Sequence, residues 1–212
     1  MSDALHIAVF ASGKGSNFLA ILQAIEDGKI PNARVVLAIS NNSDAGALSI
    51  AREHNIPAIH LSQKQFATEE LFTGALMETL SRHRVNFIAL AGYMKKLPAE
   101  ITRTFRNRIV NIHPALLPAF GGKGMYGMHV HDAVIASKAK QSGATVHIVD
   151  EEYDHGQIVL QRAIHVEENE TPESLALKVL TIEHEIYPEA IRLFAEGKVA
   201  TNGKRITILS NS

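Results

Sequence analysis

The chain has 212 residues, and its 21 Lys and Arg nearly balance its 22 Asp and Glu. This balance gives no overall field that would favour nucleic acid or an acidic membrane surface, so an anionic ligand must be held by local groups. The absence of cysteine excludes a disulfide framework, a thiolate zinc site and a cysteine nucleophile. No apolar run approaches the roughly 18 residues of a membrane span, and the first residues lack a secretion-signal pattern. We therefore expect one cytoplasmic domain that acts on small molecules.

Short apolar runs of β-forming residues alternate with segments that carry apolar residues at helical spacing. The runs predict strands over 6–10, 35–40, 58–61, 87–90 and 109–112. The segments between them predict helices over 17–27, 45–54, 68–83 and 98–105. Gly28 fits the position after a helix end, and Thr68 fits an N-cap. This alternation predicts a parallel sheet covered by helices on both faces, with ligands at the carboxyl ends of its strands.

The pattern changes in the second half of the chain. Two further strands are predicted over 144–149 and 157–164, on either side of an acidic loop at 150–156. A long helix begins at Thr171-Pro172, and a final strand is predicted over 205–209. The expected fold class is therefore α/β: a Rossmann-like, doubly wound and mostly parallel sheet with an antiparallel C-terminal strand pair and a long C-terminal helix.

A glycine-containing loop, Ala11-Ser-Gly-Lys-Gly-Ser-Asn17, follows the first predicted strand. Glycines allow a tight turn, and the free amides at a helix start attract an anion. A Walker loop is excluded because Lys14 is followed by Gly15, and the dinucleotide pattern has Phe18 in place of its last glycine. The second strand ends in Ser40-Asn-Asn42, without an acid for a ribose diol. The loop favours a phosphate monoester over NAD; the alternative is a turn that needs glycine for its geometry alone.

The fifth predicted strand ends in Asn111-Ile-His113-Pro114. Asn111 and His113 are two residues apart, so they share one face of the strand. An amide and an imidazole side by side can donate hydrogen bonds to a developing oxyanion, and His113 could also move a proton near neutral pH. The acidic loop is expected to return to the same sheet edge, where a carboxylate would raise the pKa of His113. The alternative is a structural, hydrogen-bonded pair.

The segment Asn111-Ile-His-Pro-Ala-Leu-Leu-Pro118 resembles the signature of the formyltetrahydrofolate-dependent formyltransferases. The resemblance runs over nearly the whole chain and includes Ser12-Gly-Lys-Gly-Ser-Asn17, Ala91-Gly-Tyr-Met94, Thr145-Val-His147 with Asp154, and Glu183-His184. It implies that 10-formyltetrahydrofolate, as co-substrate, gives its formyl group to the amine of glycinamide ribonucleotide in de novo purine (IMP) biosynthesis. Such a transfer needs an oxyanion site and a proton route, and it requires no metal.

The resemblance also implies roles for single residues. Asn111 and His113 would stabilise the tetrahedral intermediate, while Asp154 would orient His113 and raise its pKa. The ribose phosphate of glycinamide ribonucleotide would be held by Gly15, Ser16 and Asn17, and Gly13 and Glu183 would also bind this substrate. The folate would be bound by Met94, Lys95, Lys96, Leu97, Asn111, Asp150, Glu151, Glu152, Tyr153 and Asp154. The single domain 1–212 would then consist of a phosphate-binding half, 1–110, and a catalytic and folate-binding half, 111–212.

Three features depart from the family pattern or need separate weighing. The glycine-rich loop 119–128 is longer than usual and is expected to be either a lid or a surface excursion. A polar or basic side chain is often found at the position of Leu180. Lys14 or Lys123 could replace the phosphate-side contact that is lost there. His129 and His131 have a spacing that zinc can use, but no third ligand has a convincing spacing, so no metal is expected.

Competing functions remain open at this stage. A formyl-folate hydrolase or a methionyl-tRNA formyltransferase would also use formyl-folate, but the glycine loop argues against both, and each would be expected to carry a further domain. A non-catalytic nucleotide sensor would be expected to lose Asn111, His113 or Asp154, and the chain keeps all three. We expect small-molecule substrates without nucleic acid or membrane partners, in a monomer or a homodimer.

Overall fold

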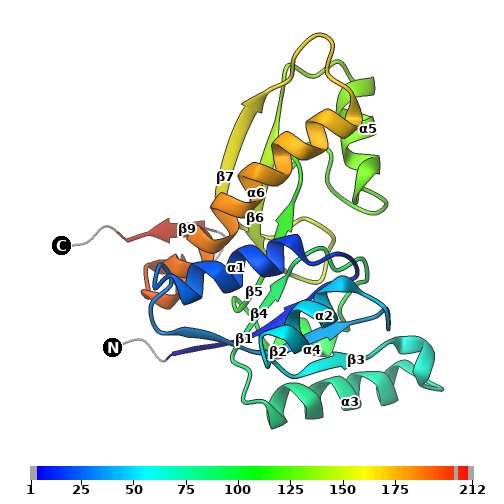
Figure 1. Cartoon of the computed structure of the whole chain (residues 1–212), viewed down its shortest axis with the longest axis vertical. Helices are drawn as coiled ribbons and strands as arrows, with labels where there is room; N and C mark the ends of the chain where they lie inside the picture. The colour runs from blue at the N-terminus through cyan, green and yellow to red at the C-terminus, as the bar shows by residue number, and fades with distance from the viewer. Residues whose placement is uncertain (1–3, 203–204, 210–212) are drawn as a thin grey trace.

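A computed structural model describes residues 4–202 and 205–209 of the chain. A seven-stranded sheet with the order β3-β2-β1-β4-β5-β6-β7 forms its centre (Figure 1). Five strands are mutually parallel: β1 (Leu5–Phe10), β2 (Ala33–Ser40), β3 (Ala58–His60), β4 (Phe87–Leu90) and β5 (Ile109–His113). An antiparallel hairpin of β6 (Gln141–Ile148) and β7 (Ile158–His165) continues the sheet beyond β5. The predicted α/β fold with a mostly parallel sheet is confirmed.

Helices cover both faces of this sheet. Alternate residues of β1 belong to two separate hydrophobic cores: Ile7 and Val9 to one, Ala8 and Phe10 to the other. The first core contains side chains of α1 (Ser16–Glu26), α2 (Gly46–Glu53), α5 (Met128–Ala136) and the long α6 (Pro172–Ala195). The second contains side chains of α3 (Glu69–Arg82) and α4 (Ala99–Thr104). The sheet is therefore doubly wound, as predicted.

Three helix ends lie at the capping residues that the sequence predicts. The Thr68 hydroxyl accepts a hydrogen bond from the Leu71 amide at the start of α3. Thr171 caps α6 in the same way, and Pro172 occupies its first turn. Gly28 follows the end of α1 with φ of 72°, a left-handed conformation that glycine adopts without strain.

The strand order reverses between β1 and β4, because the chain moves outward from β1 to β3 and then returns to the other side of β1. The loops that follow β1 and β4 therefore diverge at the carboxyl edge of the sheet. Such a point is where open α/β sheets bind their ligands. The glycine loop after β1 lies at this position.

Several elements were not predicted from the sequence. These are α5, a 3₁₀ turn at Gln63–Gln65, and β8 (Val199–Asn202), which pairs with β9 (Arg205–Ile208) in a separate two-stranded antiparallel sheet. β6 also begins at Gln141, three residues before the predicted start. The helix α5 follows Gly127, whose missing side chain offers no cap, so nothing in the local pattern marks its beginning.

Candidate active site

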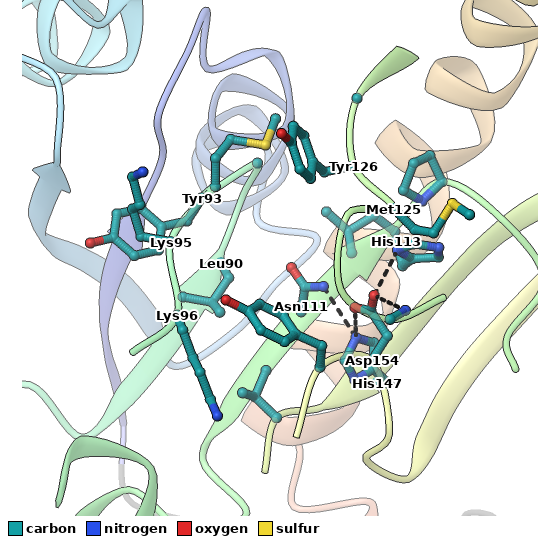
Figure 2. A pocket seen from close by; sticks show the side chains of 18 of the residues that line it. Leu90, Tyr93, Lys95, Lys96, Asn111, His113, Met125, Tyr126, His147 and Asp154 are labelled. Atoms are coloured by element: carbon teal, nitrogen blue, oxygen red, sulfur yellow. Dashed lines mark hydrogen bonds and ion pairs between the residues drawn. The ribbon is translucent and has the colours of Figure 1, made fainter. Parts of the chain in front are cut away.

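Two neighbouring cavities open at the reversal point of the sheet. The larger has a volume of about 620 Å³ and lies between the ends of β4 and β5, the glycine-rich loop, β6, and the middle of α6 (Figure 2). The smaller, about 420 Å³, surrounds the glycine loop after β1. Both cavities are lined by Lys14, Asn17, Gly92, Met94 and Lys95. One composite site is thus large enough for two substrates that meet.

The glycine loop is held tightly against α2 and the end of β2. Gly15 has φ of 84°, and a Cβ atom there would lie 2.8 Å from the Cα of Ala47. Asn42 donates its side-chain amide to the Ser12 carbonyl at 2.6 Å, and the Ser12 hydroxyl accepts from the Met94 amide at 2.8 Å. The start of α1 is therefore fixed at the mouth of the smaller cavity, with its first turn directed at this space.

Asn17 and Glu183 lie together between α1 and α6. Both are buried, and Asn17 Nδ2 donates to Glu183 Oε2 at 2.5 Å. Burial raises the pKa of Glu183 to about 7, and the hydrogen bond from Asn17 opposes this shift. Within the described part of the chain, Asn17 Oδ1 is a buried acceptor without a partner. The structure thus brings together two residues that the sequence analysis assigned to the phosphoribosyl substrate.

Asn111 and His113 lie on the same face of β5 and line the larger cavity. The partly buried carboxylate of Asp154 faces them: its Oδ2 is 3.6 Å from His113 Nδ1, and its Oδ1 is 3.5 Å from His147 Nε2 (Figure 2). The proximity of Asp154 to His113 agrees with the sequence-based expectation. His147, which no sequence-based role included, completes a cluster of four polar side chains.

Asp154 reaches His113 by a route that depends on the antiparallel pairing of β6, which the sequence does not show. Because β6 is antiparallel to β5, its last residues pair with the beginning of β5, as Ile148 does with Val110. The loop 150–156 therefore starts at the end of the sheet opposite to the predicted edge. The loop then folds back across the sheet face. The backbone is tightly packed where the loop ends, because a Cβ on Gly156 would lie only 1.7 Å from the Ile148 carbonyl oxygen. This tight return carries Asp154 to the cluster.

Asp154 acts to raise the pKa of His113, as expected from the sequence, but the net pKa of His113 is lowered. Burial lowers it, and this effect outweighs the opposite contributions of the Asp154 charge and the Phe120 carbonyl. For Asp154, burial acts to raise the pKa, but the nearby His147 and His113 rings and the hydrogen bond from the Gly122 amide leave it below its ordinary value. Asp154 is therefore a carboxylate at neutral pH, facing an imidazole that burial keeps predominantly neutral.

The glycine-rich loop 119–128 contacts both members of this pair. His113 Nε2 donates to the Phe120 carbonyl at 2.8 Å, and the Gly122 amide donates to Asp154 Oδ2 at 2.9 Å. Gly122, Gly124 and Tyr126 line the larger cavity. The loop is thus part of the site, and its role as a lid stays a prediction.

The residues predicted to bind folate lie mostly on one side of the larger cavity. Its lining includes Met94, Lys95, Lys96, Leu97, Asn111, Asp150, Glu152, Tyr153 and Asp154. The Lys96 ammonium lies 5.6 Å from the centre of the Tyr153 ring, within cation–π distance. Glu151 is outside the lining and forms an exposed ion pair with Arg103 at 3.8 Å. The structure therefore does not bring Glu151 together with the other residues predicted to bind folate.

The two substitutes proposed for the polar group missing at Leu180 differ in position. Leu180 and Lys14 both line the larger cavity, whereas Lys123 lines neither cavity. His131 of α5 also lines the larger cavity and is buried. Among the described residues, no group of three or more His, Asp or Glu is arranged to hold a metal ion.

Comparison with known proteins extends the likeness to the whole chain. A family model described as "Formyl transferase" matches residues 5–191. The chloroplastic phosphoribosylglycinamide formyltransferase of Arabidopsis thaliana is 43% identical over 206 residues, which are 97% of this chain and 70% of the plant protein. The crystal structure of glycinamide ribonucleotide transformylase 1 from Symbiobacterium toebii superposes with a TM-score of 0.92 at 40% identity, covering 99% of this chain and 96% of that one.

A formyltetrahydrofolate deformylase from Pseudomonas syringae has the same fold, with a TM-score of 0.87 at 21% identity; 99% of this chain matches 67% of that one. At this identity the likeness concerns the fold alone. The family match covers most of the chain, and the Arabidopsis and Symbiobacterium proteins resemble it over nearly its full length. The chain therefore belongs to the formyl transferase family.

Proposed function

We propose that this chain transfers the formyl group of 10-formyltetrahydrofolate to the amine of glycinamide ribonucleotide, in de novo purine biosynthesis. Relatives that resemble it over 90% or more of its length are named for formyl transfer to this acceptor. One structural observation supports the proposal most directly: Asn111, His113 and Asp154 converge in a cavity that meets the glycine loop. Donor, acceptor and polar groups can therefore meet in one place.

The chemistry is a direct acyl transfer. The neutral amine of the acceptor attacks the formyl carbon, a new C–N bond forms, and negative charge develops on the formyl oxygen. The bond from this carbon to N10 of the folate then breaks, and the proton lost by the amine is delivered to N10. The products are formylated glycinamide ribonucleotide and tetrahydrofolate. The protein contributes positioning, oxyanion stabilisation and a proton route.

Asn111 and His113 are the proposed donors to the oxyanion. Each carries an N–H group in the cavity lining, and His113 stays neutral near pH 7 because burial lowers its pKa. In the structure His113 Nε2 already donates to the Phe120 carbonyl. The mechanism requires His113 to exchange this acceptor for the formyl oxygen, which links catalysis to a movement of the glycine-rich loop. Asp154 would stabilise positive charge on His113 while the proton is transferred.

The acceptor is proposed to bind with its phosphate at Gly13, Gly15, Ser16 and Asn17. These residues line the smaller cavity, where the first turn of α1 presents backbone amides and Lys14 adds a positive charge. Asn17 and Glu183 also line the larger cavity, so both can contact the sugar of the same molecule. This placement directs the glycinamide amine toward Asn111 and His113.

The folate is proposed to bind between the segment 94–97 and the loop 150–154. Both segments line the larger cavity, where Lys96 lies near the ring of Tyr153. The half 1–110 then binds mainly phosphate, and the half 111–212 supplies the catalytic groups and most of the folate site.

The compartment and the assembly are part of the same proposal. No helix within residues 4–202 and 205–209 is long and apolar enough to cross a membrane. Although the Arabidopsis relative is named chloroplastic, we propose the cytoplasm as the compartment. The partners would be small molecules, without nucleic acid or membrane, and the protein would act as a monomer or homodimer, since every proposed group belongs to one chain.

One assay separates this function from its competitors. The protein is incubated with 10-formyltetrahydrofolate, with and without glycinamide ribonucleotide, and both the folate product and the formylated nucleotide are followed. The proposal requires tetrahydrofolate and formylated nucleotide in equal amounts, only when the nucleotide is present. Deformylation without the nucleotide would support a hydrolase, and no turnover in either mixture would support a sensor.

A further inference from the structure

His147 occupies a position between two of the proposed catalytic residues. It lies on β6 directly opposite Asn111 of β5, so the two side chains share one face of the sheet. The distance from Asn111 Nδ2 to His147 Nε2 is 3.1 Å, and the same ring nitrogen is 3.5 Å from Asp154 Oδ1 (Figure 2). The side chain of His147 is only 2% exposed. A polar ring this deeply buried must have its hydrogen bonds satisfied by protein groups.

The contacts of His147 determine which of its nitrogens carries the proton. His147 Nδ1 is 2.9 Å from the carbonyl oxygen of Ile148, and a carbonyl can only accept. Nδ1 is therefore the protonated nitrogen. In the neutral ring Nε2 is then a bare acceptor, directed at an amide nitrogen that can only donate. A proton on Nε2 would point at the Asn111 NH₂ group and break this hydrogen bond.

This hydrogen bond also determines how the Asn111 carboxamide lies. An amide group can turn over and exchange its nitrogen and oxygen, and only the nitrogen can donate to an oxyanion. The acceptor on His147 holds the NH₂ group of Asn111 on the side of β6, where it uses one N–H. The second N–H stays available for a ligand in the cavity.

We infer that His147 is a positioning residue that holds the Asn111 carboxamide in its donor orientation through an unprotonated Nε2. This inference rests on the proposed function, because the donor orientation matters only if Asn111 meets an oxyanion. His147 itself does not touch the reacting atoms in this arrangement. Its effect should therefore fall on kcat, with little change in the KM of either substrate.

Two variants separate the hydrogen bond from the rest of the side chain. In His147→Gln the Oε1 atom can take the place of Nε2 and accept from Asn111, whereas His147→Leu fills a similar volume without an acceptor. Both variants lose the donor to Ile148, so they form a matched pair. We expect kcat to fall about 10- to 100-fold in His147→Leu and by less than about fivefold in His147→Gln. An equal loss in both variants, or no loss in His147→Leu, would overturn the inference.

A double-mutant cycle with Asn111→Ala tests the connection to Asn111. If His147 acts through Asn111, His147→Leu should cause no further loss of kcat in the Asn111→Ala protein. Independent losses that multiply would show that His147 acts in another way. Thermal unfolding of all four proteins shows whether each variant remains folded.

A second measurement does not depend on activity. In protein labelled with ¹⁵N-histidine, the ring nitrogen shifts of His147 should show a proton on Nδ1 and none on Nε2 at neutral pH. The opposite tautomer would overturn the inference even in an active enzyme. If the wild-type protein transfers no formyl group to glycinamide ribonucleotide, the proposed function fails, and this spectrum alone decides whether His147 holds Asn111.

Discussion

The substitution Asp154→Asn tests the electrostatic part of the proposed mechanism. Asparagine keeps the size of the side chain and can still accept from the Gly122 amide, so mainly the charge is lost. At the observed 3.6 Å from His113 Nδ1, a full charge pair is worth about 5 kcal/mol at an effective dielectric of about 20, and about 1 kcal/mol in water. An intermediate loss of about 2–3 kcal/mol predicts a fall in kcat of about 30- to 150-fold.

Two measurements check this result. The first is the steady-state rate of formyl transfer, with KM for both substrates, in a variant shown by thermal unfolding to be folded. The second is an NMR titration of His113, whose pKa should fall further because the charge that raises it has been removed. A kcat within about threefold of wild type, or an unchanged pKa of His113, would refute the role given to Asp154.

Three further predictions concern the acceptor site and the fold. Because burial raises the pKa of Glu183, we expect Glu183→Gln to gain stability over wild type at pH 8, by up to about 3 kcal/mol, with little difference at pH 5; urea unfolding at both pH values measures this. Gly15→Ala forces a side chain into φ of 84° beside α2, so the KM for glycinamide ribonucleotide should rise several-fold or more while the KM for folate changes little. Tyr187→Phe removes a buried hydroxyl that donates to the carbonyls of Leu90 and Val110, so the free energy of unfolding should fall by about 1–3 kcal/mol in urea titrations.

The direction of the Glu183 prediction follows from proton linkage. Its pKa is 4.5 ordinarily and about 7 in the fold, so between these values the folded protein binds more protons than the unfolded chain. Stability therefore falls as pH rises from about 4.5 to 7 and stays level above that range. Glutamine resembles the protonated acid at every pH and lacks this loss. A stability difference that does not grow from pH 5 to pH 8 would contradict the prediction, as would a normal acceptor KM in Gly15→Ala or an unchanged free energy of unfolding in Tyr187→Phe.

Most of the fold could be predicted because its signals are local. The parallel strands β1, β4 and β5 are short, fully or largely buried runs, and α3 begins at the residue after Thr68, whose cap can be recognised in the sequence. The helix α5 was missed because it follows a glycine-rich stretch and has no capping side chain. Its place comes from packing against α6, with Val130 and Val134 buried, which is information from distant parts of the chain.

For the site, the sequence predicts only how residues within a single strand are placed relative to one another. The shared face of Asn111 and His113 follows from the two-residue period of a strand. His147 has the same relation to Thr145, but its place opposite Asn111 depends on the register between β5 and β6, which the sequence does not show. The lowered pKa of His113 was missed for a similar reason, since the extent of burial depends on the loops 119–128 and 150–156 closing over it.

The change from parallel to antiparallel pairing at β5 explains how this site is built. A parallel neighbour would place its following loop at the carboxyl edge, beyond the strand ends. The antiparallel β6 instead sets His147 directly beside Asn111, and the loop that connects β6 to the adjacent strand β7 brings Asp154 within reach of both histidines. Asp154 thus lies near both histidines, while the glycine-rich loop contacts His113 through Phe120 and Asp154 through Gly122. The proposed catalytic cluster is thus contacted by two loops, and in the proposed mechanism the His113–Phe120 hydrogen bond is the contact that has to break when the formyl donor binds.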